Sequence, residues 1–410
     1  MVDTSDSKSD ASNSVPVQVR PPVPHIEKAF LLLTTLLTSR ALSMKPDYTL
    51  HGWHLSYFSG KTRGYLNFKD VAFNDKKVNA YDLMIRIPKK TGVMVMPVIQ
   101  TRQGEWLQDT TIIVEELERR HPESTVVPST PRQLMASLLL EAWLDEWWIP
   151  IGMHYRWSYP ENYQLFLHDA STGLLPHAPN FIRRPLAKKV ARTLRNFLPH
   201  AGVREENFSA MESWTHKILD VFEHHFSQYA FLLGDKPSIA DFALLGPLYG
   251  HLNRDPAPKR DLLDVRPHLQ NWVERCHAGE GKQGSYLAND KIPVTLTPIF
   301  EAIFSEFYPM IDGIKASLSE YIQKKNKKSG DNIGRSVGLT STTMDGQPFT
   351  RAAMPYSLWM IQRIQAIFEG LTDADQESIN EWTAEFNQAG VMSKDLGPKL
   401  VRSNVATRLA

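Results

Sequence analysis

The feature that most constrains this chain is a proline inside an apolar run. Residues 93–99 read Val-Met-Val-Met-Pro-Val-Ile, which predicts a buried strand interrupted at Pro97. Proline cannot donate a ladder hydrogen bond, so it is normally confined to edge strands. The exception is a proline that ends a strand and presents backbone to a ligand, often through a cis peptide bond. The run therefore predicts either an edge strand or a strand that Pro97 ends beside a ligand.

The segments around this run predict an α/β arrangement. In chain order they are a strand at 48–55, a helix at 61–69, a strand near 71–73, the interrupted strand at 93–99, a short strand at 105–107 and a helix at 109–120. The last helix ends before Pro122, because proline cannot continue it. The order is thus β-α-β followed by β-β-α.

The rest of the chain predicts mostly helices, because its apolar residues recur at helical spacing. After residue 290 we expect a strongly amphipathic helix at 299–325, a Gly/Ser/Thr-rich loop or hairpin at 329–350, and helices near 352–369 and 373–388.

The first 45 residues predict a disordered or extended tail followed by a short helix near 25–40. Its apolar part, residues 30–37, is far shorter than the ~20 residues that span a bilayer. We favour an amphipathic helix lying on the folded body over a membrane anchor. The start of the chain does not have the pattern of a secretory signal, and we expect no transmembrane segment.

Charge and cysteine content exclude several classes of function. The formal net charge of +1 does not suggest a nucleic-acid-binding protein. The single cysteine, Cys276, excludes an intramolecular disulfide and a cysteine-rich zinc site, and we expect it to be a buried apolar residue. The pair His224-His225 lacks other ligands at metal spacing, so we expect packing rather than a metal. A reducing compartment, the cytoplasm, fits these features.

Four motifs follow one another in a family-specific order. They are Leu-Ser-Tyr-Phe-Ser-Gly-Lys-Thr-Arg at 55–63, Val-Met-Pro-Val-Ile at 95–99, Leu-Gln-Asp-Thr-Thr at 107–111, and Gly-Asp-Lys-Pro-Ser-Ile-Ala-Asp-Phe at 234–242. Together they resemble the cytosolic glutathione transferase superfamily, and the chain is similar to its long bacterial members with a C-terminal extension. The last motif has the form of an internal capping box, in which Ser238 and Asp241 exchange hydrogen bonds.

The resemblance implies a fold of class α/β plus all-α, and it covers about residues 48–280. We expect the tail and short helix at 1–45, a thioredoxin-like glutathione-binding domain at 46–123, a helical transferase C-terminal domain at 124–288, and a mostly helical extension at 289–410. It also implies a homodimer, whose usual interface the extension either blocks or replaces.

The resemblance also implies site residues. A hydroxyl after the first strand would stabilise the glutathione thiolate, and Ser56 is the leading candidate, with Tyr57 and Ser59 as rivals. Tyr57 departs from the proline that many members have at its position. A turn or helix-capping role for Ser56 stays open.

Glutathione itself would be held by backbone and polar groups. The Met96 backbone, oriented by Pro97, would pair with the cysteinyl backbone. Asp109 and Thr110, at a helix start, would bind the γ-glutamyl end. The alternatives are that Pro97 only ends a strand and that Asp109 and Thr110 only cap the helix. Lys89 or Lys90 would reach the glycyl carboxylate, unless both are solvated.

A stretch rich in aromatic residues would line the pocket of the second substrate. Its candidates are Trp147, Trp148, His154, Tyr155 and Trp157, with Trp143, Asp145, Glu146 and Arg156 among them. Core packing is the alternative for most of these.

Two functions remain open from the sequence. The first is an enzyme that activates the glutathione thiol for attack on an apolar electrophile. The second is a non-catalytic scaffold of the same fold that acts through protein or membrane contacts. The candidate site residues favour the enzyme, and the extension favours the scaffold.

Overall fold

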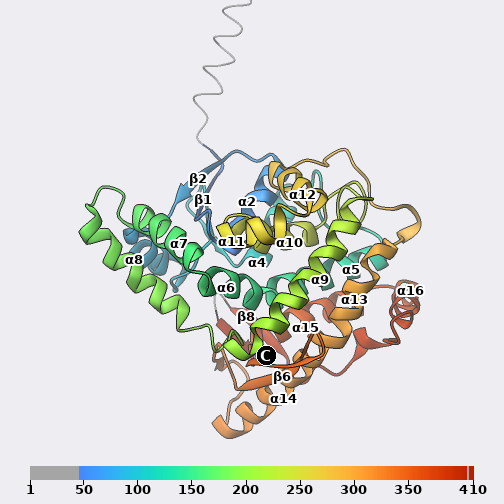
Figure 1. Cartoon of the computed structure of the whole chain (residues 1–410). Helices are drawn as coiled ribbons and strands as arrows, with labels where there is room; N and C mark the ends of the chain where they lie inside the picture. Colours follow the sequence, from blue (N-terminus) through green and yellow to red (C-terminus); the bar gives the residue numbers. More distant parts are fainter. Residues whose placement is uncertain (1–45, 404–405) are drawn as a thin grey trace, which may run out of the picture. The chain divides into compact units, whose positions relative to one another are not determined.

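A four-stranded mixed sheet begins the part of the chain that the structure, a computed structural model, describes: residues 46–403 and 406–410. Its strands are β1 (Tyr48–Gly52), β2 (Phe73–Lys77), β3 (Val98–Thr101) and β4 (Trp106–Gln108), in the spatial order β2-β1-β3-β4. Strands β1 and β2 are parallel, and the other two pairs are antiparallel. Parallel neighbours need a crossover, which helix α2 (Tyr57–Lys69) supplies. This is the predicted thioredoxin-like order (Figure 1).

The proline-containing run differs from its predicted form. The Met96–Pro97 peptide bond is cis, but the strand begins only at Val98. Residues 93–97 form no strand, because Pro97 has no amide hydrogen with which to continue the ladder. A helical stretch that the sequence did not predict, a π-helical turn at Asp82–Arg86 followed by α3 (Ile87–Thr91), precedes the run. Helix α4 (Thr110–Arg120) follows β4 where it was expected.

The second segment is helical, as predicted. Its helices are α5 (Pro131–Glu146), α6 (Ile149–Ser158), α7 (Pro160–Leu174), α8 (Asn180–Arg195), α9 (Phe208–Phe226), α10 (Ile239–Pro247), α11 (Pro256–Pro258) and α12 (Pro267–Ala278). Every residue of α10 is buried, and this helix packs against α2 and α5. Cys276 is buried too.

The predicted capping box opens α10. The Asp241 carboxylate accepts hydrogen bonds from the Ser238 amide at 2.8 Å and from the Leu232 amide at 2.9 Å. These contacts satisfy backbone donors that a buried helix start would otherwise leave unpaired.

The extension contains more strand than predicted. A helical run from Thr297 to Lys325, made of α13 (Thr297–Ala302), a π-helical turn and α14 (Tyr308–Lys325), fulfils the expectation for 299–325. The segment predicted as a loop or hairpin holds the hairpin β6 (Leu339–Met344) and β7 (Gln347–Ala352). Asp345 and Gly346 form its turn with positive φ angles of 52° and 72°.

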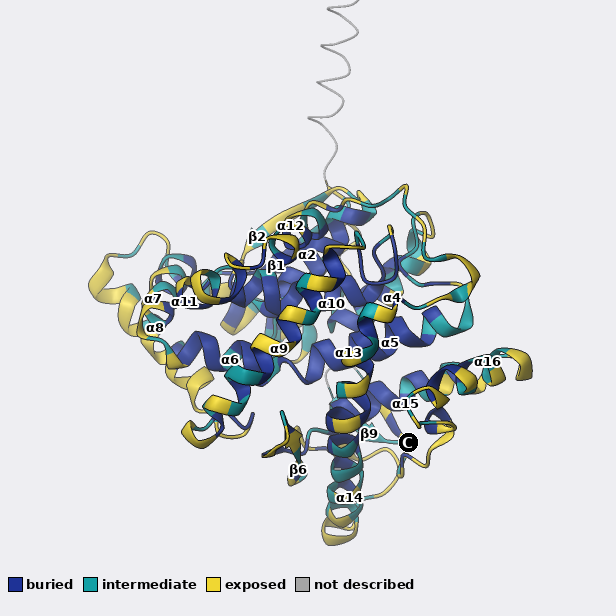
Figure 2. Cartoon of the chain, turned by 45° about the vertical axis from the view of Figure 1, so that its right-hand side comes forward, coloured by how far each residue is buried: buried dark blue, intermediate teal, exposed yellow. Residues whose placement is uncertain are grey.

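Two helices and a small sheet complete the extension. Helices α15 (Pro355–Glu369) and α16 (Asp373–Ala384) match the prediction. Strands β5 (Asn332–Ile333), β8 (Leu400–Ser403) and β9 (Ala406–Leu409) form a sheet that the sequence did not predict. One apolar core contains residues of all three predicted segments, for example Leu50, Trp143 and Met360. Figure 2 shows buried residues in helices of each segment, among them α2, α10 and α15.

The expected helix at 25–40 lies outside the described residues. Of the helices the structure does describe, none has both the length and the apolar character to cross a bilayer.

Candidate functional site

One pocket of about 540 Å³ gathers residues from all three segments of the chain. The thioredoxin-like segment contributes Phe58, Val93, Val95, Met96, Pro97, Gln108, Asp109 and Thr110. The start of the helical segment contributes Asp145, Glu146 and Ile149. The extension contributes Asn332, Ile333, Gly334, Arg335, Met354, Pro355, Tyr356, Arg402, Ala406 and Thr407. The pocket thus lies beside Pro97, and the extension forms a large part of its wall.

Four residues singled out from the sequence meet in this pocket: Met96, Pro97, Asp109 and Thr110. They come from the ends of β3 and β4, which are neighbours in the sheet. Thr110 is the first residue of α4, whose first amides have no partner within the helix, so this end of the helix favours an anion.

Asp109 is held in place from two sides. Its φ of 75° is unusual for a residue other than glycine, and its carboxylate accepts from the Thr111 amide at 3.2 Å. The extension supplies two further donors, the Tyr356 hydroxyl and the Arg402 guanidinium, each at 2.9 Å. The Arg402 guanidinium also lies over the ring of Tyr356. Nothing in the sequence pattern connects Arg402 or Tyr356 with Asp109.

The turn after β1 uses its hydroxyls for local structure. Ser56 caps α2 by accepting from the Ser59 amide at 3.3 Å, and the Tyr57 hydroxyl donates to the Leu144 carbonyl. Ser59 is fully buried, and its oxygen accepts from the Trp53 amide. Phe58 is the residue of this turn that lines the pocket. The helix begins at Tyr57 rather than at the predicted Lys61, so these residues lie in its cap and first turn.

The lysine and aromatic candidates do not line the pocket. Lys89 and Lys90 are exposed in α3 and are not among the lining residues. The aromatic stretch is core: Trp147 and Trp148 are fully buried and pack against Trp214.

His154, Tyr155 and Trp157 are also buried, and His154 bonds to Ser158 and Glu212. These aromatic residues are candidates because they are close together in the sequence, and the structure uses them for packing, which is the alternative interpretation. In the described part of the chain, no group of three or more His, Cys, Asp or Glu side chains is arranged to hold a metal ion.

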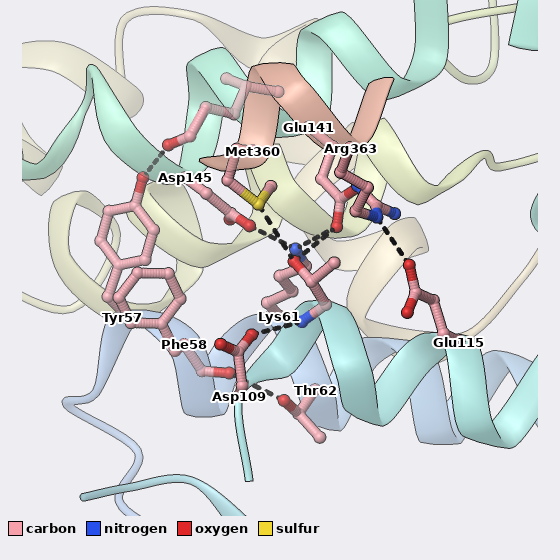
Figure 3. Close-up of polar contacts among 12 residues, drawn as sticks. Tyr57, Phe58, Lys61, Thr62, Asp109, Glu115, Glu141, Asp145, Met360 and Arg363 are labelled. Carbon is pink, nitrogen blue, oxygen red and sulfur yellow. Dashed lines mark hydrogen bonds and ion pairs between the residues drawn. The ribbon is translucent and has the colours of Figure 1, made fainter. Parts of the chain in front are cut away.

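A buried charge cluster lies beside the pocket (Figure 3). Lys61 Nζ contacts Glu141 at 2.9 Å and Asp145 at 2.5 Å, and the three side chains are almost completely buried. Arg363 of the extension contacts Glu141 at 3.4 Å and Glu115 at 2.6 Å. Burial alone would lower the pKa of Lys61, but the two carboxylates raise it overall, so Lys61 is a cation. The cluster joins all three segments electrostatically.

Glu146 brings a titratable group to the pocket wall. Burial raises its pKa to about 7, although the Ser357 hydroxyl donates to the carboxylate at 2.5 Å. Next to it, burial raises the pKa of Asp145, although the Lys61 ammonium opposes this shift. Glu146 is therefore a carboxyl group at this wall that changes charge near neutral pH.

The free energy of unfolding should depend on pH through the protonation of Glu146. The folded state holds this proton more tightly than the unfolded chain, so the free energy of unfolding falls as pH rises from 4.5 to about 7. We expect Glu146 to account for a fall of about 3 kcal/mol. Urea titrations of wild type and Glu146→Gln over this range would measure it as the difference between the two slopes. Identical slopes would contradict the assignment.

Comparison with known proteins finds two domain families in the chain. Residues 50–125 match the family "Glutathione S-transferase, N-terminal domain", and residues 193–280 match "Glutathione S-transferase, C-terminal domain". The first match contains the pocket residues from Phe58 to Thr110, and neither match includes residues 281–410. No curated protein has significant sequence similarity to the chain.

The solved structures to which the chain is similar are distant in sequence. A glutathione S-transferase from Pseudomonas fluorescens is 19% identical with a TM-score of 0.33, over 56% of this chain and 94% of its own. A transferase from Methylobacterium radiotolerans, solved with glutathione sulfonate, is 18% identical with a TM-score of 0.36, over 60% and 97%. Transferase GSTFuA3 from Phanerochaete chrysosporium is 18% identical with a TM-score of 0.40, over 58% and 98%.

Proposed function

Because the chain belongs to the glutathione S-transferase superfamily, we propose that its pocket binds glutathione and presents the thiol to an apolar electrophile. The observation that supports this most is that Met96, Pro97, Asp109 and Thr110 line a single pocket. Its volume of about 540 Å³ lies in the range of small-ligand sites.

The γ-glutamyl end of glutathione carries an ammonium and a carboxylate on one carbon. In our proposal, Asp109 accepts from the ammonium, while Arg402 and the first turn of α4 donate to the carboxylate. The 2.9 Å pair of Asp109 and Arg402 then faces a ligand with the complementary pair of charges. The extension thus takes part in glutathione binding.

The rest of the tripeptide would contact the same wall of the pocket. The Met96 backbone pairs with the cysteinyl backbone, in the manner of an added β-strand. Arg335 lines the pocket and, in our proposal, takes the place of Lys89 as the cation for the glycyl carboxylate.

The thiol must be held as thiolate, because its pKa near ~8.5 leaves it largely protonated at neutral pH. Lowering that pKa by about 2 units takes roughly 2.7 kcal/mol. The N-terminus of α2 and one hydroxyl can supply this stabilisation. We propose Ser56 as the donor, since its oxygen accepts from the Ser59 amide and no described residue accepts its own proton.

The variant Ser56→Ala tests this assignment. Loss of the cap should lower the free energy of unfolding by about 1 kcal/mol. Loss of a hydrogen bond to the thiolate should also lower kcat with a generic aryl halide by about tenfold or more. Undiminished kcat would remove Ser56 from the chemistry while leaving glutathione binding untouched.

The second candidate function is a scaffold of the same fold without turnover. It is favoured by the hydrogen bonds that Tyr356 and Arg402 donate to Asp109, because they already occupy the carboxylate that the γ-glutamyl ammonium would need. Calorimetric titration of the full chain with glutathione, followed by the aryl halide assay, separates the two functions. Absence of binding at millimolar glutathione would end the enzyme proposal.

A further inference from the structure

Helix α8 is strongly basic, although the chain as a whole is almost neutral. Its 16 residues include six cations, Arg183, Arg184, Lys188, Lys189, Arg192 and Arg195, and no acidic residue. The whole chain has a net charge of only +1. All of these cations except Arg183 are exposed.

These charges are not neutralised by neighbours. Among the described residues, no ion pair involves an α8 side chain. The adjacent helix α7 carries Glu161 and Asp169, but these pair with Arg260 and Lys77. Arg184 donates to the Gln164 amide and Arg183 to that of Asn180, which are neutral partners. The helix therefore presents an uncompensated positive field.

The same helix exposes large apolar side chains. Phe181 is 78% exposed and Ile182 49% exposed at its start, and Leu194 is 41% exposed near its end. The fully buried positions of the helix are the small residues Ala187 and Ala191. Figure 2 shows α8 as a mostly exposed helix at one side of the described chain. Leu186 and Val190 of α8 pack against the core, whereas Phe181, Ile182 and Leu194 remain exposed, which suits a surface that is covered by something else.

A groove runs between α8 and α7 beside these residues. It has a volume of about 700 Å³, and Arg184, Lys188, Arg192 and Arg195 contribute to its lining. Tyr163 lies opposite, with the Arg195 guanidinium over its ring. Four cations around one groove suit a phosphate group, since guanidinium and ammonium groups donate several charge-assisted hydrogen bonds to its oxygens.

We propose that α8 is a binding surface for a bilayer that contains anionic lipids. Lipid phosphates would occupy the groove, and Phe181 and Ile182 would enter the boundary between head groups and acyl chains. This combination of exposed aromatic and aliphatic residues with an all-cationic polar face is typical of helices that lie in a membrane interface. Nucleic acid would use the charges alone and would leave Phe181 in water. The proposal does not depend on glutathione binding.

Vesicle flotation of the full chain tests the proposal. We expect binding to phosphatidylcholine vesicles that contain phosphatidylserine, loss of that binding at high salt, and little binding to phosphatidylcholine alone. A cation near an anionic surface contributes about fivefold, so Lys188→Gln with Arg192→Gln should weaken binding about 25-fold. Phe181→Ser should weaken binding while keeping its salt dependence.

A matched control removes the same charge elsewhere. Lys324→Gln with Lys325→Gln neutralises two exposed lysines at the end of α14. Among the described residues, no exposed large apolar residue lies within ten positions of them in the sequence. This variant should bind vesicles within about twofold of wild type, and circular dichroism would show that all variants are folded. The proposal is overturned by an equal loss in this control, by equal binding to neutral vesicles, or by binding to duplex DNA without binding to vesicles.

Discussion

Replacing Lys61 with methionine should lower the free energy of unfolding by about 3 to 5 kcal/mol, the largest effect that we expect from a single substitution. Lys61 is fully buried and is the cation shared by Glu141 and Asp145. Without it, both carboxylates stay buried with much less compensation, because Arg363 reaches only Glu141, at 3.4 Å. Urea unfolding of wild type and variant at neutral pH would measure the loss.

Two further variants show whether the loss comes from the charges. Lys61→Met combined with Glu141→Gln and Asp145→Asn should recover much of the lost stability, since no buried carboxylate is then left without its cation. Lys394→Met removes the exposed pair with Asp312 and should cost less than about 1 kcal/mol. A triple variant as unstable as Lys61→Met, or a single variant as stable as wild type, would contradict this account of the cluster.

Arg402→Gln should weaken glutathione binding by about tenfold to a hundredfold. Arg402 lies 2.9 Å from Asp109 at the pocket wall, and in our proposal it donates to the γ-glutamyl carboxylate. Removal of one partner of a buried, hydrogen-bonded charge pair typically costs several kcal/mol of binding energy, and the helix start at Thr110 retains part of the interaction. Titration calorimetry with glutathione would measure the change.

Arg408→Gln is the matched control for this experiment. Arg408 lies on strand β9 next to Thr407. Thr407 lines the pocket and Arg408 does not, so this variant should keep the affinity for glutathione. Equal losses in both variants would mean that the extension acts through its fold and not through Arg402.

Much of the fold could be predicted because its signals are local. The β-α-β and β-β-α order, the proline-containing run and the capping box of Ser238 and Asp241 each depend on residues close together in the sequence. The amphipathic stripe over 299–325 is similarly local, and the helix forms there. The same holds for Met96, Pro97, Asp109 and Thr110, which the sheet topology brings to one edge.

The missed features depend on long-range packing. Tyr356 and Arg402 lie 247 and 293 residues from Asp109 in the sequence. No periodic pattern in the sequence indicates that they contact it. Apolar character alone does not distinguish a pocket wall from a core, so Trp147 and Trp148 were candidates for both. Strands β8 and β9 are four residues each, too short for a clear alternating pattern.

A crystal structure of the full chain soaked with glutathione would test the central claim most directly. Our account predicts the tripeptide in the pocket, with its cysteinyl backbone on Met96 and its γ-glutamyl end between Asp109, Thr110 and Arg402. An unoccupied pocket at saturating glutathione, or glutathione bound away from Pro97, would contradict it.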